Sequence, residues 1–221
     1  MNLEKNIVRF EKEFSKINRD GAKELLEYIR KSDMYSAPGS TRFHLSVTGG
    51  LLQHSLNVLD ALRSLLQDNK DGTYTYLICG KDLKNNKFLV TEENLVVIAL
   101  LHDLCKTKFY KIENKWKKDE NNKWVSYEAF STEDEIPLGH GEKSCLMIQQ
   151  YMRLEPVELY SIRWHMGFSD SMNPQMVNTL SNAIDKYPMI WATHNADMIA
   201  SHFMEADNEN VPPFDSNEGA N

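Results

Sequence analysis

An apolar run in this chain ends in two adjacent side chains that are able to bind a cation. Residues Leu95–Leu101 are all apolar, and His102 and Asp103 follow directly. Burying an imidazole and a carboxylate at the end of an apolar helix is costly unless a partner compensates both groups. A divalent metal ion is such a partner, because it accepts imidazole nitrogen and carboxylate oxygen together. The pair therefore predicts a metal site, with Lys106 as a nearby positive charge.

Four other metal-binding side chain types stand in apolar or glycine-rich surroundings at helix ends or on helix faces. They are His54, His140, His165 and Asp197. Each has an ordinary alternative when taken alone, since a single helical histidine is more often a hydrogen-bonded core residue than a ligand. Apart from His102 and Asp103, no two of these residues form a local motif such as the paired histidines of one helical turn. The prediction therefore depends on their joint arrangement.

The composition is that of one ordinary globular domain. The chain has 221 residues, enough for a substantial core. Its net charge of -7 gives no general attraction to nucleic acid, so any basic binding surface must be local. No apolar run is long enough to cross a bilayer, and the first five residues are not typical of a signal peptide. Three scattered cysteines fit reduced thiols, and we expect a cytoplasmic protein without membrane contact.

The spacing of apolar residues predicts a mainly α fold. Helical periodicity occurs in residues 3–32, 51–66, 92–101, 142–152, 157–164, 173–185 and 188–199. We expect residues 1–204 to form a single helical domain. Residues 205–221 are acidic and without periodicity, which predicts a disordered tail.

Residues 107–135 change to an alternating pattern, which predicts a β-hairpin inserted between two helices. Aromatic residues alternate there with polar ones, and six lysines lie along the segment. A basic ribbon with aromatic rings is able to hold phosphates and stack bases. A solvated hairpin with one packed face is the alternative that the sequence leaves open. The direct connection of this segment to His102 and Asp103 favours a role at the site.

The order of these residues resembles the HD-domain superfamily of metal-dependent phosphohydrolases. Three segments carry the resemblance, namely GGLLQHSL at 49–56, LLHDLCK at 100–106 and WATHNAD at 191–197. The first is similar to the first-ligand helix in the HD domains of certain bacterial 3′–5′ exoribonucleases. The resemblance covers residues 40–204 and implies an HD-domain helical bundle.

The resemblance also implies two groups of ligands. One divalent ion would be bound by His54, His102, Asp103 and Asp197. In the binuclear branch of the family a second ion is bound by His140 and His165, with Asp103 bridging. Because this sequence contains both His140 and His165, we expect two ions, drawn from Mn, Fe, Co, Ni or Mg. Two adjacent ions would activate water and polarise a phosphoryl oxygen together.

Substrate contacts are predicted around these ligands. Asp103 and Lys106 are the predicted catalytic residues, with Lys106 holding a phosphate oxygen as a point charge. Cys105 stands where the family often has glycine, which we interpret as a packing change. Further substrate contacts, each with a structural alternative, are expected from His44, Lys143 and Arg163.

Metal-dependent hydrolysis of a phosphate ester is the function that these features favour. The expected substrate is a phosphorylated small molecule, a nucleotide, a cyclic nucleotide or a short oligonucleotide, including short single-stranded nucleic acid. A minority of HD proteins are di-iron oxygenases of small organic substrates, and this alternative stays open, as does a non-catalytic nucleotide-binding protein. Lys106 and the lysine-rich hairpin favour phosphate chemistry. The sequence makes no prediction about the oligomeric state.

Overall fold

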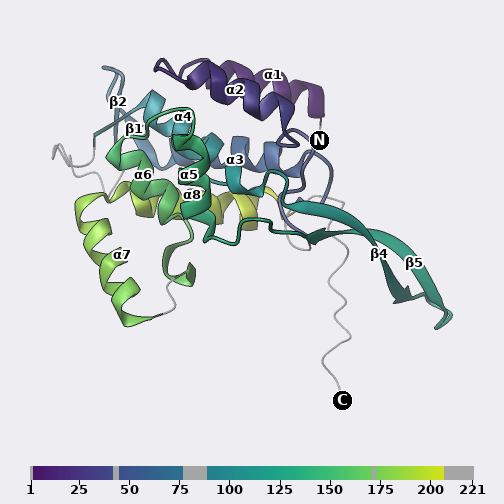
Figure 1. The fold of residues 1–221 in the computed structure, drawn as a ribbon. Coiled ribbons are helices and arrows are strands. Elements are labelled where there is room, and N and C mark those ends of the chain that lie inside the picture. The colour runs from purple at the N-terminus through teal and green to yellow at the C-terminus, as the bar shows by residue number, and fades with distance from the viewer. Residues whose placement is uncertain (1, 42–44, 77–88, 171–172, 207–221) are drawn as a thin grey trace.

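The computed structural model describes residues 2–41, 45–76, 89–170 and 173–206. This part of the chain is a mainly α-helical body from which a β-hairpin projects (Figure 1), which confirms the predicted fold class. The helices are α1 (Leu3–Phe14), α2 (Ala22–Lys31), α3 (Gly50–Ser64), α4 (Glu92–Leu101), α5 (His140–Gln149), α6 (Pro156–Arg163), α7 (Pro174–Lys186) and α8 (Met189–Ile199). Among the described helices, none has the length and apolar character that crossing a membrane requires.

Helix α4 is the centre of the fold. Thr91 caps its N terminus in a capping box with Asn94, each side chain bonding the other residue's backbone N–H. Every residue from Asn94 to Leu101 is buried, because α1, α3 and α6 all pack against this helix. A helix that is apolar on all sides belongs in the interior. The residues that follow it, His102 and Asp103, are therefore buried as well.

Helix α3 packs against both α4 and α8, close to the end of α4 where His102 and Asp103 lie. Two glycines allow its N terminus to pack closely against the preceding loop. Gly49 has a φ of 81°, in the left-handed region that favours glycine. At Gly50 a Cβ atom would lie 2.0 Å from the carbonyl oxygen of Leu45, so no larger residue fits. This close packing fixes the first turn of α3, and His54 follows at the start of the second turn.

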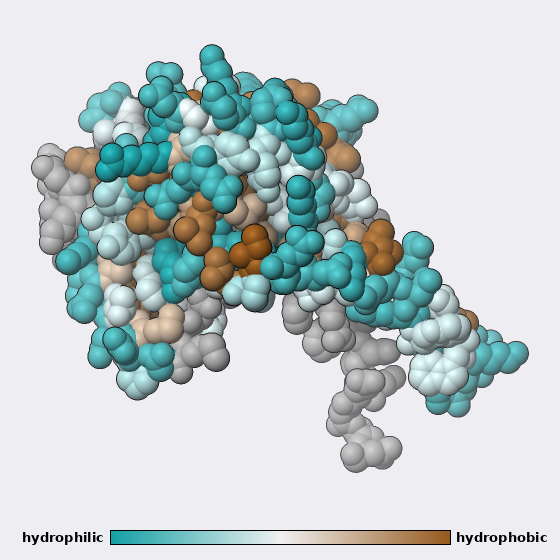
Figure 2. Space-filling model, in the orientation of Figure 1, coloured by the Kyte–Doolittle hydropathy of each residue, from teal (hydrophilic) through white to brown (hydrophobic). Residues whose placement is uncertain are grey.

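The strands form two small antiparallel sheets. The first contains β1 (Leu66–Asp68), β2 (Thr73–Tyr76) and β3 (Val90–Thr91). The second is the predicted hairpin, in which β4 (Tyr110–Lys118) pairs with β5 (Trp124–Thr132) from Tyr110 opposite Thr132 to Lys118 opposite Trp124. Figure 2 shows this hairpin standing off the body of the molecule.

The ordered chain extends beyond residue 204. Helix α8 continues into a π-helical turn at Ala200–Met204, and the side chain of Glu205 that follows is fully buried. The prediction of a disordered tail from residue 205 is therefore wrong at Glu205, because this carboxylate accepts hydrogen bonds from His54 and Asn57. Residues 207–221 lie outside the described residues.

A buried ion pair holds the N-terminal half of α4 in place. Arg19 bonds Glu93 in the first turn of α4 and makes two further bonds, of 2.8 and 2.9 Å, with Glu158 of α6. Glu158 is fully buried and also accepts a bond of 2.9 Å from Asn94. Burial raises the pKa of Glu158 even though Arg19 and Asn94 favour its charged form. The guanidinium of Arg19 is therefore the cation that keeps this buried carboxylate compensated.

We expect Arg19→Met to lower the free energy of unfolding by about 3 kcal/mol, because it leaves the buried Glu158 without its cation. The control is Arg9→Met, which removes an ion pair with Asp60 whose side chains are 38% and 40% exposed. That change should cost less than about 1 kcal/mol. Urea unfolding of both variants measures the difference, and equal losses would contradict the role given to Arg19.

Candidate metal centre

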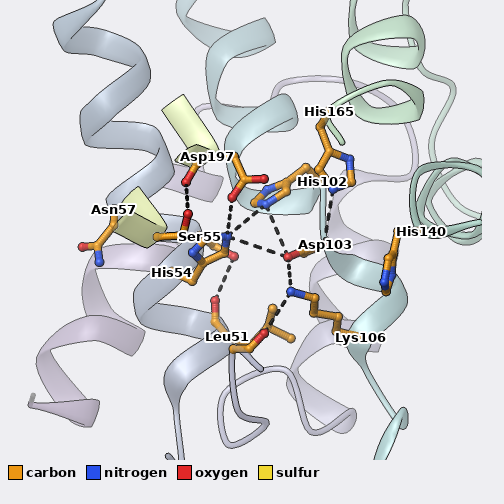
Figure 3. Close-up of polar contacts among 12 residues, drawn as sticks. Leu51, His54, Ser55, Asn57, His102, Asp103, Lys106, His140, His165 and Asp197 are labelled. Atoms are coloured by element: carbon orange, nitrogen blue, oxygen red, sulfur yellow. Dashed lines mark hydrogen bonds and ion pairs between the residues drawn. The ribbon is translucent and has the colours of Figure 1, made fainter. Parts of the chain in front are cut away.

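Side chains from four separate parts of the chain meet in one buried cluster (Figure 3). The cluster consists of His54 from α3, His102 and Asp103 after α4, His165 after α6 and Asp197 from α8. His54 Nε2 lies 3.3 Å from His102 Nε2 and 3.2 Å from Asp197 Oδ1. The two carboxylate oxygens of Asp103 lie 3.5 Å from His102 Nε2 and 3.6 Å from His165 Nε2. Five of the six predicted ligands are therefore neighbours.

These separations fit ligands that share an ion. Nitrogen and oxygen ligands about 2.1 Å from one ion lie about 3.0 to 3.4 Å apart at octahedral or tetrahedral angles. The distances from His54 Nε2 to His102 Nε2 and to Asp197 Oδ1, 3.3 and 3.2 Å, fall in this range. The cluster is thus able to hold a divalent ion with little change in side-chain position.

Each histidine of the cluster is oriented by a hydrogen bond from its outer nitrogen. His102 and His165 donate from Nδ1 to the backbone carbonyl three residues earlier, over 2.9 and 2.8 Å. His54 donates from Nδ1 to the carboxylate of Glu205 over 3.0 Å. In a neutral ring these bonds leave the lone pair on Nε2, which faces the cluster. The lone pairs of His54 and His102 repel each other at 3.3 Å unless a cation or a proton lies between them.

The charges of the cluster favour a bound cation. Burial lowers the pKa of His102 to about 4, so this ring is neutral at pH 7. Burial also opposes a charge on His54, but Asp197 and Glu205 outweigh it and raise the pKa of His54 to about 10. Burial would raise the pKa of Asp103, yet the Lys106 ammonium and the neighbouring rings hold it well below its usual range. The carboxylates therefore attract positive charge to the point where an ion would bind.

Lys106, the residue predicted to bind a phosphate oxygen, lies next to Asp103. Its Nζ is 2.7 Å from Asp103 Oδ2 and donates to the carbonyl oxygen of Gly39 over 2.9 Å. The hydroxyl of Tyr110, at the base of the hairpin, donates to the same carbonyl over 3.4 Å. This shared carbonyl connects the hairpin to the cluster. Asp197 is the most exposed cluster side chain, at 16%, which indicates the side from which solvent reaches the site.

His140, the sixth predicted ligand, lies beside Asp103 but away from His165. Its Nδ1 is 3.3 Å from the sulfur of Cys105, and ligand atoms of Asp103, Cys105 and His140 all lie within 4.8 Å of one another. Among the described residues, the ligand groups join His165 with His102 and Asp197, not with His140. Asp103 thus has the other cluster residues on one side and His140 on the other (Figure 3), where the neighbour of His140 is the Cys105 thiol and not His165.

The two described residues among the remaining predicted substrate contacts have carboxylate partners outside the cluster. Lys143 is paired with Asp134, and Arg163 is paired with Glu142 while its guanidinium carbon lies 3.9 Å from the centre of the Trp164 ring. These carboxylate partners favour the structural alternative for both cations. His44 lies outside the described residues.

Sequence reasoning missed the residues that support the ligands. Glu205 was assigned to the tail, although it follows Asp197 by eight residues, a spacing that places two residues on one side of a helix. Asn57, one turn after His54, donates to the Glu205 carboxylate over 2.9 Å. A carboxylate that accepts from a ligand histidine fixes its tautomer and raises its basicity. The spacing from Asp197 is the signal that would have found Glu205.

Comparison with known proteins gives one family. A family model described as the HD domain matches residues 51–193, about two thirds of the chain. The match includes five of the six predicted ligands and ends shortly before Asp197. The comparison with curated proteins and the comparison with solved structures each gave no match.

We expect Glu205→Gln to weaken binding of the first divalent ion about 10- to 100-fold. A neutral amide no longer places a negative charge against His54 Nδ1–H, so Nε2 becomes a weaker ligand. Calorimetric titration with Mn²⁺ measures the affinity, and Glu24→Gln on the exposed face of α2 serves as the control. An unchanged affinity in a folded Glu205→Gln variant would show that this carboxylate does not tune the ligand.

Proposed function

This chain belongs to the HD-domain family, and from that premise we propose that it hydrolyses phosphate esters with bound divalent metal ions. The observation that carries the proposal is the convergence of three inward-facing histidine nitrogens and two carboxylates in one buried cluster. The finer resemblance to the HD domains of bacterial exoribonucleases supports a nucleotide or a short oligonucleotide as the substrate. The proposed location is the cytoplasm.

We assign the first ion to His54, His102, Asp103 and Asp197, with His165 beside them. His140 and Asp103 would hold a second ion, since their ligand atoms lie within 4.8 Å of each other. Such ions lower the pKa of a coordinated water and polarise a phosphoryl oxygen. The chain supplies the geometry, since the Nδ1 bonds of His102 and His165 fix their rings before any substrate arrives.

Lys106 is the residue that we propose to bind the substrate phosphate. Its ammonium is held next to Asp103 by the carbonyl of Gly39, so it already lies at the edge of the cluster. An ammonium attracts a phosphate oxygen without a fixed geometry, which suits a substrate whose charge shifts during reaction. Asp103 keeps Lys106 protonated, because the carboxylate raises the pKa of this buried amine in spite of its burial.

The hairpin offers a surface on which nucleobases would stack. Trp116 and Trp124 are each 64% exposed, and both alternate onto the same face of the ribbon. The ammonium of Lys118 lies 5.7 Å from the centre of the Trp124 ring. Residues 110–132 contain five lysines and four acidic residues, so charge contributes little to attraction. Stacking must therefore provide most of the affinity for a single strand.

Replacing a central ligand should abolish hydrolysis. We expect His102→Ala to reduce turnover of a generic phosphodiester by more than about 100-fold in Mn²⁺. This loss is larger than the roughly 10- to 100-fold that is typical when a residue that only supports a ligand is replaced. The control is His202→Ala, because His202 is exposed and lies outside the ligand groups found among the described residues.

Normal turnover by His102→Ala would contradict a reaction at this cluster. Oxygen consumption by the iron-loaded protein, without ester hydrolysis, would instead favour the oxygenase. Tight nucleotide binding without any product would favour the non-catalytic alternative.

The stacking surface is tested by comparing an oligonucleotide substrate, which has bases to stack, with a small phosphodiester, which has none. Trp116→Ala combined with Trp124→Ala should raise KM for a short single-stranded oligonucleotide at least about 10-fold, because stacking contributes about 1 to 3 kcal/mol per base. Turnover of a small phosphodiester should stay unchanged. The matched control replaces both residues by Phe, which keeps a stacking ring and should restore KM. Equal effects on both substrates would rule out a binding role for the hairpin.

A further inference from the structure

Cys105 is a buried thiol that lies beside two other side chains able to bind a metal ion. It is 1% exposed and belongs to the 3₁₀ turn Leu104–Lys106 that follows α4. Its sulfur faces His140 Nδ1 at 3.3 Å. This sulfur, a ring nitrogen of His140 and a carboxylate oxygen of Asp103 all lie within 4.8 Å of one another. Thiol, imidazole and carboxylate are the three side chains that bind zinc in proteins. Figure 3 shows His140 on the opposite side of Asp103 from His54.

The backbone holds this group rigidly. The N–H of Cys105 donates to the hydroxyl of Ser144 over 3.1 Å, and Ser144 is fully buried. Ser144 lies one turn after His140 in α5, so the bond fixes the thiol relative to the imidazole. A metal position with ligands fixed in this way requires little reorganisation when the ion binds.

The separation of sulfur and nitrogen fits a shared ion. Zinc lies about 2.3 Å from a thiolate and about 2.0 to 2.1 Å from an imidazole, so tetrahedral ligands of these types are about 3.5 Å apart. The observed distance between Cys105 Sγ and His140 Nδ1 is 3.3 Å. A hydrogen bond from the thiol would have a similar length, and the carboxylate of Asp103 is what makes the group a set of three ligands.

We propose that Cys105 is a thiolate ligand of a second metal position, together with His140 and Asp103, and that this position selects a borderline ion such as Zn²⁺ or Fe²⁺ over Mg²⁺. The inference rests on the proposed function for the first ion, with which it shares Asp103. It replaces the interpretation of Cys105 as a packing change.

Binding at this position is balanced in bonds and in protons. The S–H bond breaks as the metal–sulfur bond forms, and the proton passes to solvent. Without an ion the thiol stays protonated, because burial and the charge of Asp103 raise the pKa of Cys105 to about 12. Lys106 and Lys143 are close enough to favour the thiolate once it forms.

The test is a titration of the full chain with Co²⁺, which absorbs strongly in the near ultraviolet when a thiolate is bound to it. We expect this band in the wild type and in Cys145→Ser, and its loss in Cys105→Ser. Cys145 is the matched control, because it is also buried but its sulfur faces the carbonyl of Leu159. Both variants keep Cys79, so a band due to that residue would persist in each.

Zinc affinity gives a second measurement. Cys105→Ser should weaken Zn²⁺ at the second position at least about 10-fold and leave Mn²⁺ affinity at the first position unchanged, because sulfur favours the softer ion. X-ray absorption of the zinc-loaded wild type should show sulfur at about 2.3 Å, a result that needs no variant to fold.

Two outcomes would overturn the assignment. One is a Co²⁺ band that survives in Cys105→Ser, and the other is two bound equivalents with no sulfur signal in the wild type. Phosphodiester hydrolysis without any sulfur signal would reject the thiolate and leave the proposed function standing. A sulfur signal with no hydrolysis of any ester would keep the thiolate and reject the proposed function.

Discussion

The ionised carboxylate of Asp103 is the group on which the other features of the site depend. It lies at the end of a helix that is buried along its apolar length, so water cannot stabilise its charge. The chain surrounds it with the Lys106 ammonium and the rings of His102 and His165. A buried charge that is compensated from several sides fixes the positions of its partners. The packing of α3 and α6 against α4 thus buries apolar side chains and also brings charged and metal-binding side chains to Asp103.

The helices were predictable because apolar periodicity reports burial directly. Thr91 is a residue type that caps helices, and it caps α4, whose apolar run ends directly before His102. The alternation after Lys106 likewise predicted the hairpin, since period-two spacing on a ribbon with one polar face is hard to fit to a helix. The tail prediction includes Glu205 because residues 205–221 are acidic and without periodicity. The spacing from Asp197 places Glu205 on the same side of a helix, but no local pattern reports its contact with His54, 151 residues away.

The site was predictable to a different depth. Residue types and their order predicted the side chains that meet around His102, because few other side chains bind divalent ions. Their pairing was not predictable, and His140 illustrates why. The direction of its ring depends on how α5 packs beside the turn at residues 104–106, through the bond between Ser144 and Cys105. That packing places Cys105, which the sequence analysis interprets as a packing residue, next to His140.

The charge balance of the cluster explains why two different metal positions would suit a phosphate ester. When His54 is a neutral ligand, the carboxylates of Asp103, Asp197 and Glu205 leave three negative charges against the one positive charge of Lys106. One divalent ion therefore neutralises the first position and leaves nothing to attract an anion. A second divalent ion, paired with the one negative charge of a Cys105 thiolate, adds a net positive charge. Under the proposed function, a phosphodiester with its one negative charge would therefore be attracted to the cluster when both positions are filled.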